Sequence, residues 1–194
     1  MPRQSTRCPA AIYAAGAILS IGDPRSGGRL RRCLILWHGF RGEIVTEVPL
    51  FQIRPYAERD RDAVVALWQV CGLLRAWNDP LEDIALCLRS PGARLFVASG
   101  TDDDGTGGLR ATIMCGSDGH RGWLYYLAVD PTRRREGLAR RMVRHAEDWL
   151  AGCGIRKVEL MIRPENDAVR AFYERVGYEV EPRLVMSRWL RDDE

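Results

Sequence analysis

The sequence predicts a mixed α/β fold in which helices flank one central sheet, in the order β-α-α-β-β-β-α-β-α-β. Three observations support this prediction. An alternating strand at 51–54 is followed by two segments with helical spacing. Segments 94–98 and 109–115 are typical of antiparallel strands joined by a loop. From residue 123 onward, strand and helix patterns alternate along the chain.

Residues that typically begin or end helices and strands set the bounds of the first elements. The strand at 51–54 ends at Pro55, and we expect Asp60 to cap a helix that ends before Gly72. Between them, apolar residues recur at helical spacing, namely Ala63, Val64, Leu67, Trp68 and Cys71. A second helix is expected from Pro80 to Leu88, where the apolar residues again share one face.

The later elements are predicted in the same way. A strongly apolar strand comes first, and each helix after it has an apolar face. In order, they are a strand at 123–129, a helix from Gly137 to about Ala151, a strand from Lys157 to Ile162, a helix capped by Asn166 or Asp167 and ended by Gly177, and a strand from Leu184 to Leu190.

Composition excludes several classes of protein. The chain has 194 residues, of which 46% are apolar and 28% charged, so a disordered or fibrous chain is not expected. Its six cysteines are widely spaced and form no C-x-x-C pair, which argues against a disulfide scaffold, a zinc site or a redox motif. We expect reduced cysteines in a cytoplasmic protein, and no bound metal.

Charge divides the chain into two parts. Residues 1–48 have seven arginines against three acidic residues, whereas residues 49–194 have 22 basic and 23 acidic groups. We therefore predict a basic N-terminal extension at 1–48, either disordered or the product of a start codon set too far upstream, and a single domain at 49–194. Within the extension, Ala10 to Ile21 resembles the apolar core of a signal peptide, but it lacks a clean cleavage site. It is shorter than the roughly 20 residues that span a bilayer, so no membrane partner is expected.

A basic turn between the strand at 123–129 and the following helix is the strongest sign of function. The first turn of a helix offers unpaired N–H groups and the positive end of the helix dipole, which suit a phosphate. Gly137 has no Cβ, so a diphosphate can approach the backbone there. Arginines surround the turn at positions 133, 134, 135 and 140. No P-loop and no G-x-G-x-x-G motif is present.

Three motifs resemble the GNAT superfamily of N-acetyltransferases. Residues 134–139 (RREGLA) are similar to its R/Q-x-x-G-x-G/A element, and 127–131 (LAVDP) to its fourth strand. Residues 166–178 (NDAVRAFYERVGY) are similar to its N-x-x-A-x-x-F-Y-x-x-x-G-[FY] helix. The resemblance covers about 51–190 and implies a mixed, mostly antiparallel sheet. The sequences at 77–80 (WNDP) and 118–122 (DGHRG) resemble those of a bacterial subgroup of these enzymes.

The resemblance implies acetyl-CoA as co-substrate, bound where the fourth and fifth strands splay apart. Backbone groups of Leu127 and Val129 would hold the acetyl carbonyl and the pantetheine arm. Asn166 would contact the pantetheine, cap its helix, or do both. Backbone N–H groups would hold the pyrophosphate along the turn at Arg134, Arg135, Gly137, Leu138, Ala139 and Arg140.

The resemblance also implies that Tyr173 is the general acid that protonates the departing thiolate; the alternative is a tyrosine packed in the core. No acidic residue lies on the strand at 123–129, so the base is left open. Its candidates, each of which has an ordinary surface or turn role as the alternative, are Asp79, Asp118, His120 and Glu165. The acceptor groove would be lined by Arg75, Trp77, Asn78 and Asp79.

The function that the sequence favours is direct transfer of an acetyl group to a primary amine of a small molecule, an amino acid, or a protein N-terminus or lysine. The alternative is a non-catalytic module that binds acyl-CoA as a sensor. A nucleic-acid binder is disfavoured because the domain at 49–194 has a net charge of −1. The resemblance is compatible with a monomer or a homodimer.

Overall fold

A computed structural model describes residues 51–101 and 107–190. The predicted extension at 1–48 and the acidic loop residues Asp102, Asp103 and Asp104 lie outside these described residues. The described part contains β1 (Gln52–Pro55), the 3-10 helix η1 (Glu58–Asp60), α1 (Arg61–Val70), α2 (Pro80–Arg89), β2 (Ala93–Thr101), β3 (Gly107–Ser117), β4 (Gly122–Val129), η2 (Pro131–Arg133), α3 (Leu138–Gly152), β5 (Val158–Glu159) and α4 (Asp167–Arg175).

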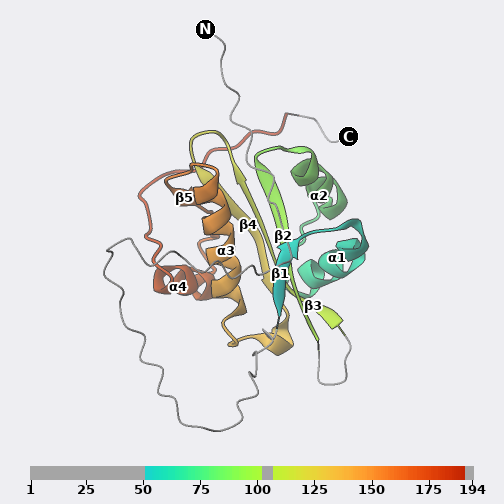
Figure 1. Cartoon of the computed structure of the whole chain (residues 1–194). Coiled ribbons are helices and arrows are strands. Elements are labelled where there is room, and N and C mark those ends of the chain that lie inside the picture. The colour runs from blue at the N-terminus through green and yellow to red at the C-terminus, as the bar shows by residue number, and fades with distance from the viewer. Residues whose placement is uncertain (1–50, 102–106, 191–194) are drawn as a thin grey trace, which may run out of the picture. The chain divides into compact units, whose positions relative to one another are not determined.

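The five strands form one sheet in the order β1-β2-β3-β4-β5. The first three pairings are antiparallel, and β4 pairs with β5 in parallel. Figure 1 shows α1 and α2 on one side of the sheet and α3 and α4 on the other. The predicted mixed α/β fold with a mostly antiparallel sheet is therefore confirmed.

A separate hydrophobic cluster packs on each face of the sheet. On the face of α3 and α4, Met142, Ala146 and Leu150 of α3 lie against Ile113 and other sheet residues. On the face of α1 and α2, Trp68 is fully buried in the second cluster. Both faces of the sheet are covered, which explains the almost continuous apolar run of β4.

Two predicted elements need correction. Leu184 to Leu190 form no strand; the segment has no regular structure, and the Leu184 side chain is 95% exposed. A strand is stable only where its backbone groups find partners, and apolar composition alone does not supply them. The strand predicted at Lys157 to Ile162 is reduced to the two residues of β5.

The beginning of α1 also differs from expectation. Asp60 does not cap α1 through its side chain. Its carboxylate instead accepts hydrogen bonds from Arg54 at 2.6 and 2.7 Å and from the backbone N–H of Ala57 at 2.8 Å. The Arg54 guanidinium lowers the pKa of Asp60. No helix of the described segments is long and apolar enough to cross a membrane.

Candidate acyl-transfer site

The two parallel strands separate soon after they begin. β4 pairs with β5 only at Gly122 with Val158 and at Trp123 with Glu159. A Cβ on Gly122 would lie 2.9 Å from Leu150 Cδ1, so α3 packs closely on this end of β4. From Tyr125 to Val129, β4 has no pairing with β5 in the described structure. This stretch of β4 therefore forms no ladder with β5, although the Val129 carbonyl accepts a hydrogen bond from the Cys71 thiol at 3.3 Å.

A β-bulge occurs in the same half of β4. Thr112 pairs with Ala128 and Met114 with Tyr125, so Ile113 faces two residues of β4, Tyr126 and Leu127. Tyr126 has a φ of 49°, which is uncommon for a residue other than glycine. Its ring stacks on Trp68 with centroids 4.0 Å apart, and its hydroxyl donates to Asp83. Burial, together with that bond, raises the pKa of Tyr126 to about 12.

The turn after β4 has an unusual backbone. Asp130 begins it by accepting the Thr132 backbone N–H at 2.9 Å. Arg135 and Gly137 then have positive φ values of 71° and 78°. A Cβ at Gly137 would meet no atom within 4 Å, so the space beside the start of α3 is open. Successive N–H groups in such a turn can form a concave site for an anion.

The side chains around this turn are mostly basic and solvent-facing. Arg134, Arg135 and Arg140 are exposed, whereas Arg133 forms an ion pair with Glu136 at 3.7 Å. Leu138 is buried and anchors the first turn of α3 in the core. Leu138 thus holds the start of α3 to the core, while the neighbouring arginine side chains face solvent.

Tyr173 lies inside the cluster on the face of α3 and α4 and is 6% exposed. Its ring makes edge contacts with Phe172 and Tyr178. Burial and the charge of Glu147 raise its pKa above the ordinary value. Leu127 and Val129 pack against the same cluster. The structure therefore brings Tyr173 to the face of the sheet on which these two β4 side chains lie.

Asn166 caps α4, because its side chain accepts the Val169 backbone N–H at 3.3 Å. The predicted cap is thus confirmed for Asn166 rather than for Asp167. A contact between Asn166 and pantetheine stays a prediction.

The predicted acceptor residues occupy the loop between α1 and α2. Trp77 is 55% exposed, and the Arg163 guanidinium lies 5.8 Å from its ring centroid. This contact joins the loop to the segment that follows β5. Asn78 Nδ2 lies 3.5 Å from Asp83 Oδ2. Asp79 caps α2 by accepting the Leu81 backbone N–H at 2.8 Å, which is the turn role given above as the alternative to a general base. Arg75 donates to backbone carbonyls of its own loop.

Asp118 and His120 lie in the turn before Gly122, at the opposite end of β4 from Val129. The Asp118 carboxylate accepts from the backbone N–H groups of His120 and Arg121 and from the Trp123 indole. These hydrogen bonds lower its pKa to about 2, which makes it a weak base. The structure therefore separates both residues from the bulge. Glu165 is exposed, just before the cap of α4.

Several buried or hydrogen-bonded polar groups were missed by sequence reasoning. Thr112 is fully buried on β3, although it reads as an ordinary strand residue. Asp83 is bonded to Tyr126, and Glu147 accepts from the Tyr178 hydroxyl at 2.7 Å. A carboxylate among helix surface residues gives no local signal of a partner that lies far away in the sequence.

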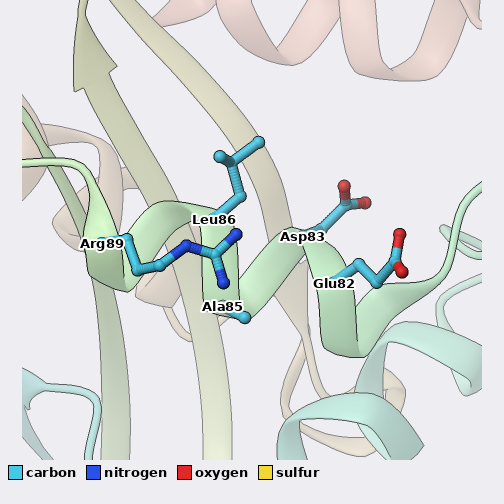
Figure 2. A pocket seen from close by; sticks show the side chains of 5 residues that line it. All are labelled: Glu82, Asp83, Ala85, Leu86 and Arg89. Atoms are coloured by element: carbon cyan, nitrogen blue, oxygen red, sulfur yellow. The ribbon is translucent and has the colours of Figure 1, made fainter. Parts of the chain in front are cut away.

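The described residues also form a shallow, open depression along α2, lined by Glu82, Asp83, Ala85, Leu86 and Arg89. Figure 2 shows these side chains along the one helix. The depression includes none of the predicted site residues, and through Asp83 it adjoins Tyr126. Within the described segments, no group of three or more His, Cys, Asp or Glu residues could hold a metal.

Comparison with known proteins identifies the same region of the chain. The model of the Acetyltransferase (GNAT) family matches residues 57–178. An acetyltransferase of Pectobacterium atrosepticum is 37% identical over 142 residues, which are 73% of this chain and 97% of the relative.

Solved structures share the fold. The aminoglycoside acetyltransferase AAC(6')-Iy, in complex with a bisubstrate analogue of CoA, has a TM-score of 0.60 at 19% identity, covering 72% of this chain and 97% of that one. The 6'-N-acetyltransferase AAC(6')-Ih of Acinetobacter baumannii has a TM-score of 0.58 at 17% identity, covering 73% and 99%. At these identities the likeness concerns the fold alone.

Proposed function

Because the chain belongs to the GNAT family and is an acetyltransferase, we propose that it transfers the acetyl group of acetyl-CoA directly to a primary amine. The observation that supports this most is the parting of β4 from β5 beside the exposed, left-handed turn at Arg135 and Gly137. The bisubstrate analogue bound by AAC(6')-Iy contains CoA, which agrees with acetyl-CoA as the co-substrate here.

In the proposed complex, the N–H groups from Arg134 to Arg140 hold the pyrophosphate, and the arginine side chains attract the polyanion. Backbone groups of Leu127 and Val129 hold the acetyl carbonyl and the pantetheine. The amine attacks the thioester carbon, the C–S bond breaks, and Tyr173 gives its hydroxyl proton to the thiolate sulfur. The Cys71 thiol donates to the Val129 carbonyl at 3.3 Å, but direct attack by the amine needs no acyl-enzyme.

The pKa of the acceptor amine determines whether its deprotonation needs a general base. Deprotonating a lysine amine at pH 7 costs about 4.6 kcal/mol, whereas an α-amine costs about 1.4 kcal/mol. Since β4 bears no carboxylate and Asp118 is a weak base, the proposed site favours amines of low pKa, which water can deprotonate. We place the acceptor beside Trp77 and Asn78.

A thiol-release assay tests the proposal. The full chain is mixed with acetyl-CoA and with amines that differ in pKa, from α-amino esters and peptides to lysine and polyamines. We expect CoA release that depends on the amine and an acetylated product by mass spectrometry. Calorimetric titration with acetyl-CoA runs in parallel. Binding without turnover on any amine would favour the sensor, and absence of binding would contradict both functions.

A further inference from the structure

A chain of hydrogen bonds links three elements at the bulge. The Trp68 indole N–H of α1 donates to Thr112 Oγ1 at 2.9 Å. The Thr112 hydroxyl donates in turn to the backbone carbonyl of Tyr126 at 3.0 Å. Trp68 and Thr112 are both fully buried, so water does not compete for the bond between them.

The chain of bonds ends on Tyr126, the residue that leaves the regular ladder. A non-glycine residue in the left-handed region persists only where its surroundings hold it there. Tyr126 is held by its stack on Trp68, by the bond from its hydroxyl to Asp83 and by the bond from Thr112 to its carbonyl. Of these contacts, the Thr112 bond is made to the backbone itself, and so to the orientation of one peptide plane.

That peptide plane also contains the N–H of Leu127. The described chain has no cis peptide bond, and in a planar trans peptide the N–H points opposite to the C=O. Fixing the Tyr126 carbonyl therefore fixes the direction of the Leu127 N–H. Hydrogen bonding at the carbonyl also polarises the peptide, which makes its N–H a better donor.

We propose that Thr112, held by Trp68, is a positioning residue that aims the Leu127 N–H at the acyl oxygen of the thioester. The inference rests on the proposed function, because it needs acetyl-CoA in the parted strands. A donor that stabilises a developing oxyanion contributes about 10²–10³-fold to a rate. Misorienting such a donor, without removing it, should cost about tenfold.

Thr112→Val tests the proposal, since valine keeps the β-branched shape and replaces the hydroxyl with a methyl group. We expect kcat for thiol release to fall about tenfold, with KM for acetyl-CoA changed less than about twofold because the pyrophosphate turn is untouched. Thr112→Ser keeps the oxygen and should restore most of kcat. Trp68→Phe keeps a ring on Tyr126 but removes the N–H, and should give an intermediate loss.

The Trp68 indole resonance reports on the hydrogen bond to Thr112 and so distinguishes a loss of positioning from a loss of stability. In ¹H–¹⁵N spectra, the Trp68 indole signal, assigned by its absence in Trp68→Phe, should move in Thr112→Val and stay in Thr112→Ser. Leu150→Ala, a buried change on the opposite face, is the control for stability and should keep the wild-type kcat at temperatures below unfolding. If Thr112→Val does not fold, Thr112→Ala replaces it.

The possible outcomes are distinct. Wild-type kcat in Thr112→Val, with a shifted indole signal, would overturn the positioning role while leaving the acetyltransferase intact. An equal loss in Thr112→Ser, or a matching loss in Leu150→Ala, would overturn it as well. A wild-type chain that releases no thiol with any amine would instead overturn the proposed function, and this inference with it.

Discussion

The two halves of β4 face different constraints. In the paired half, Gly122 and Trp123, β4 lies between β3 and β5, and α3 packs so closely that a Cβ on Gly122 would collide with Leu150. In the parted half, Tyr125 to Val129, the edge toward β5 is open and the ladder with β3 is interrupted by a bulge. One strand thus supplies rigidity at one end and, at the other, an edge that forms no ladder with β5.

The largest effect on rate is expected from Tyr173→Phe, next to the parted half. Loss of a general acid should lower kcat about 10²-fold, with KM for acetyl-CoA nearly unchanged. Because burial raises the pKa of Tyr173, the wild-type hydroxyl stays protonated, and kcat should show no loss from phenol ionisation up to about pH 10. Steady-state kinetics against pH provides the measurement. Tyr178→Phe is the matched control, and an unchanged kcat in Tyr173→Phe would leave this tyrosine a purely structural residue.

The paired half should respond in stability instead. Gly122→Val forces a side chain against Leu150 and Ile155, and overpacking of this kind costs about 2 kcal/mol of unfolding free energy. Urea denaturation measures the loss, while kcat of the folded enzyme should stay within about twofold. Gly152→Ala, where a Cβ meets no atom within 4 Å, should change stability little. A large fall in kcat of folded Gly122→Val would erase the distinction between the halves.

The turn that follows the parted half should respond in cofactor affinity. Gly137→Val introduces a side chain where the diphosphate is expected, and KM for acetyl-CoA should rise about tenfold. The substitution also strains a left-handed residue by about 1 kcal/mol. Gly154→Val shares a positive φ and open surroundings just beyond the far end of α3, so it reproduces the strain alone. If both variants raised KM equally, backbone strain and not cofactor contact would be responsible.

The smallest effect is expected from the part of the chain outside this comparison. We propose that residues 1–48 are dispensable, since the family match spans 57–178 and the Pectobacterium relative is matched over 97% of its length by 142 residues. A chain starting at residue 49 should keep kcat and KM within about twofold, measured by thiol release. Loss of soluble enzyme on deletion would contradict the proposal.

The sequence predicted most of the elements because hydrophobic periodicity reflects burial. The apolar face of α3, for example, includes Leu138, Met142 and Leu150, which are all buried. The bulge was not predictable in this way: Tyr125 and Tyr126 are both favourable strand residues, and an extra residue leaves no local trace. The prediction of a strand at 184–190 was wrong for the opposite reason: its composition is typical of a strand, but its backbone pairs with no other strand of the described chain.

The candidate site was predictable only where backbone N–H groups and charged side chains would bind the ligand. The turn at Arg135 and Gly137 was found from its basic residues and its glycine. Thr112 was not, because its role depends on Trp68 and Tyr126, which lie far from it in the sequence. Asp118 was proposed as a general base because it is a carboxylate, yet this carboxylate accepts hydrogen bonds that close its own turn.

The bulge has a consequence for how this chain tolerates insertions and deletions. Leu124 and Leu127 both contact the cluster beneath α3, although they are three residues apart, because the bulge contributes one extra residue between them. Deleting one tyrosine of the pair at 125 and 126 would leave a regular strand in which both leucines keep their face. The core would survive while the irregular backbone at the site disappeared. Removal of a single codon would thus convert the bulged strand into a regular one.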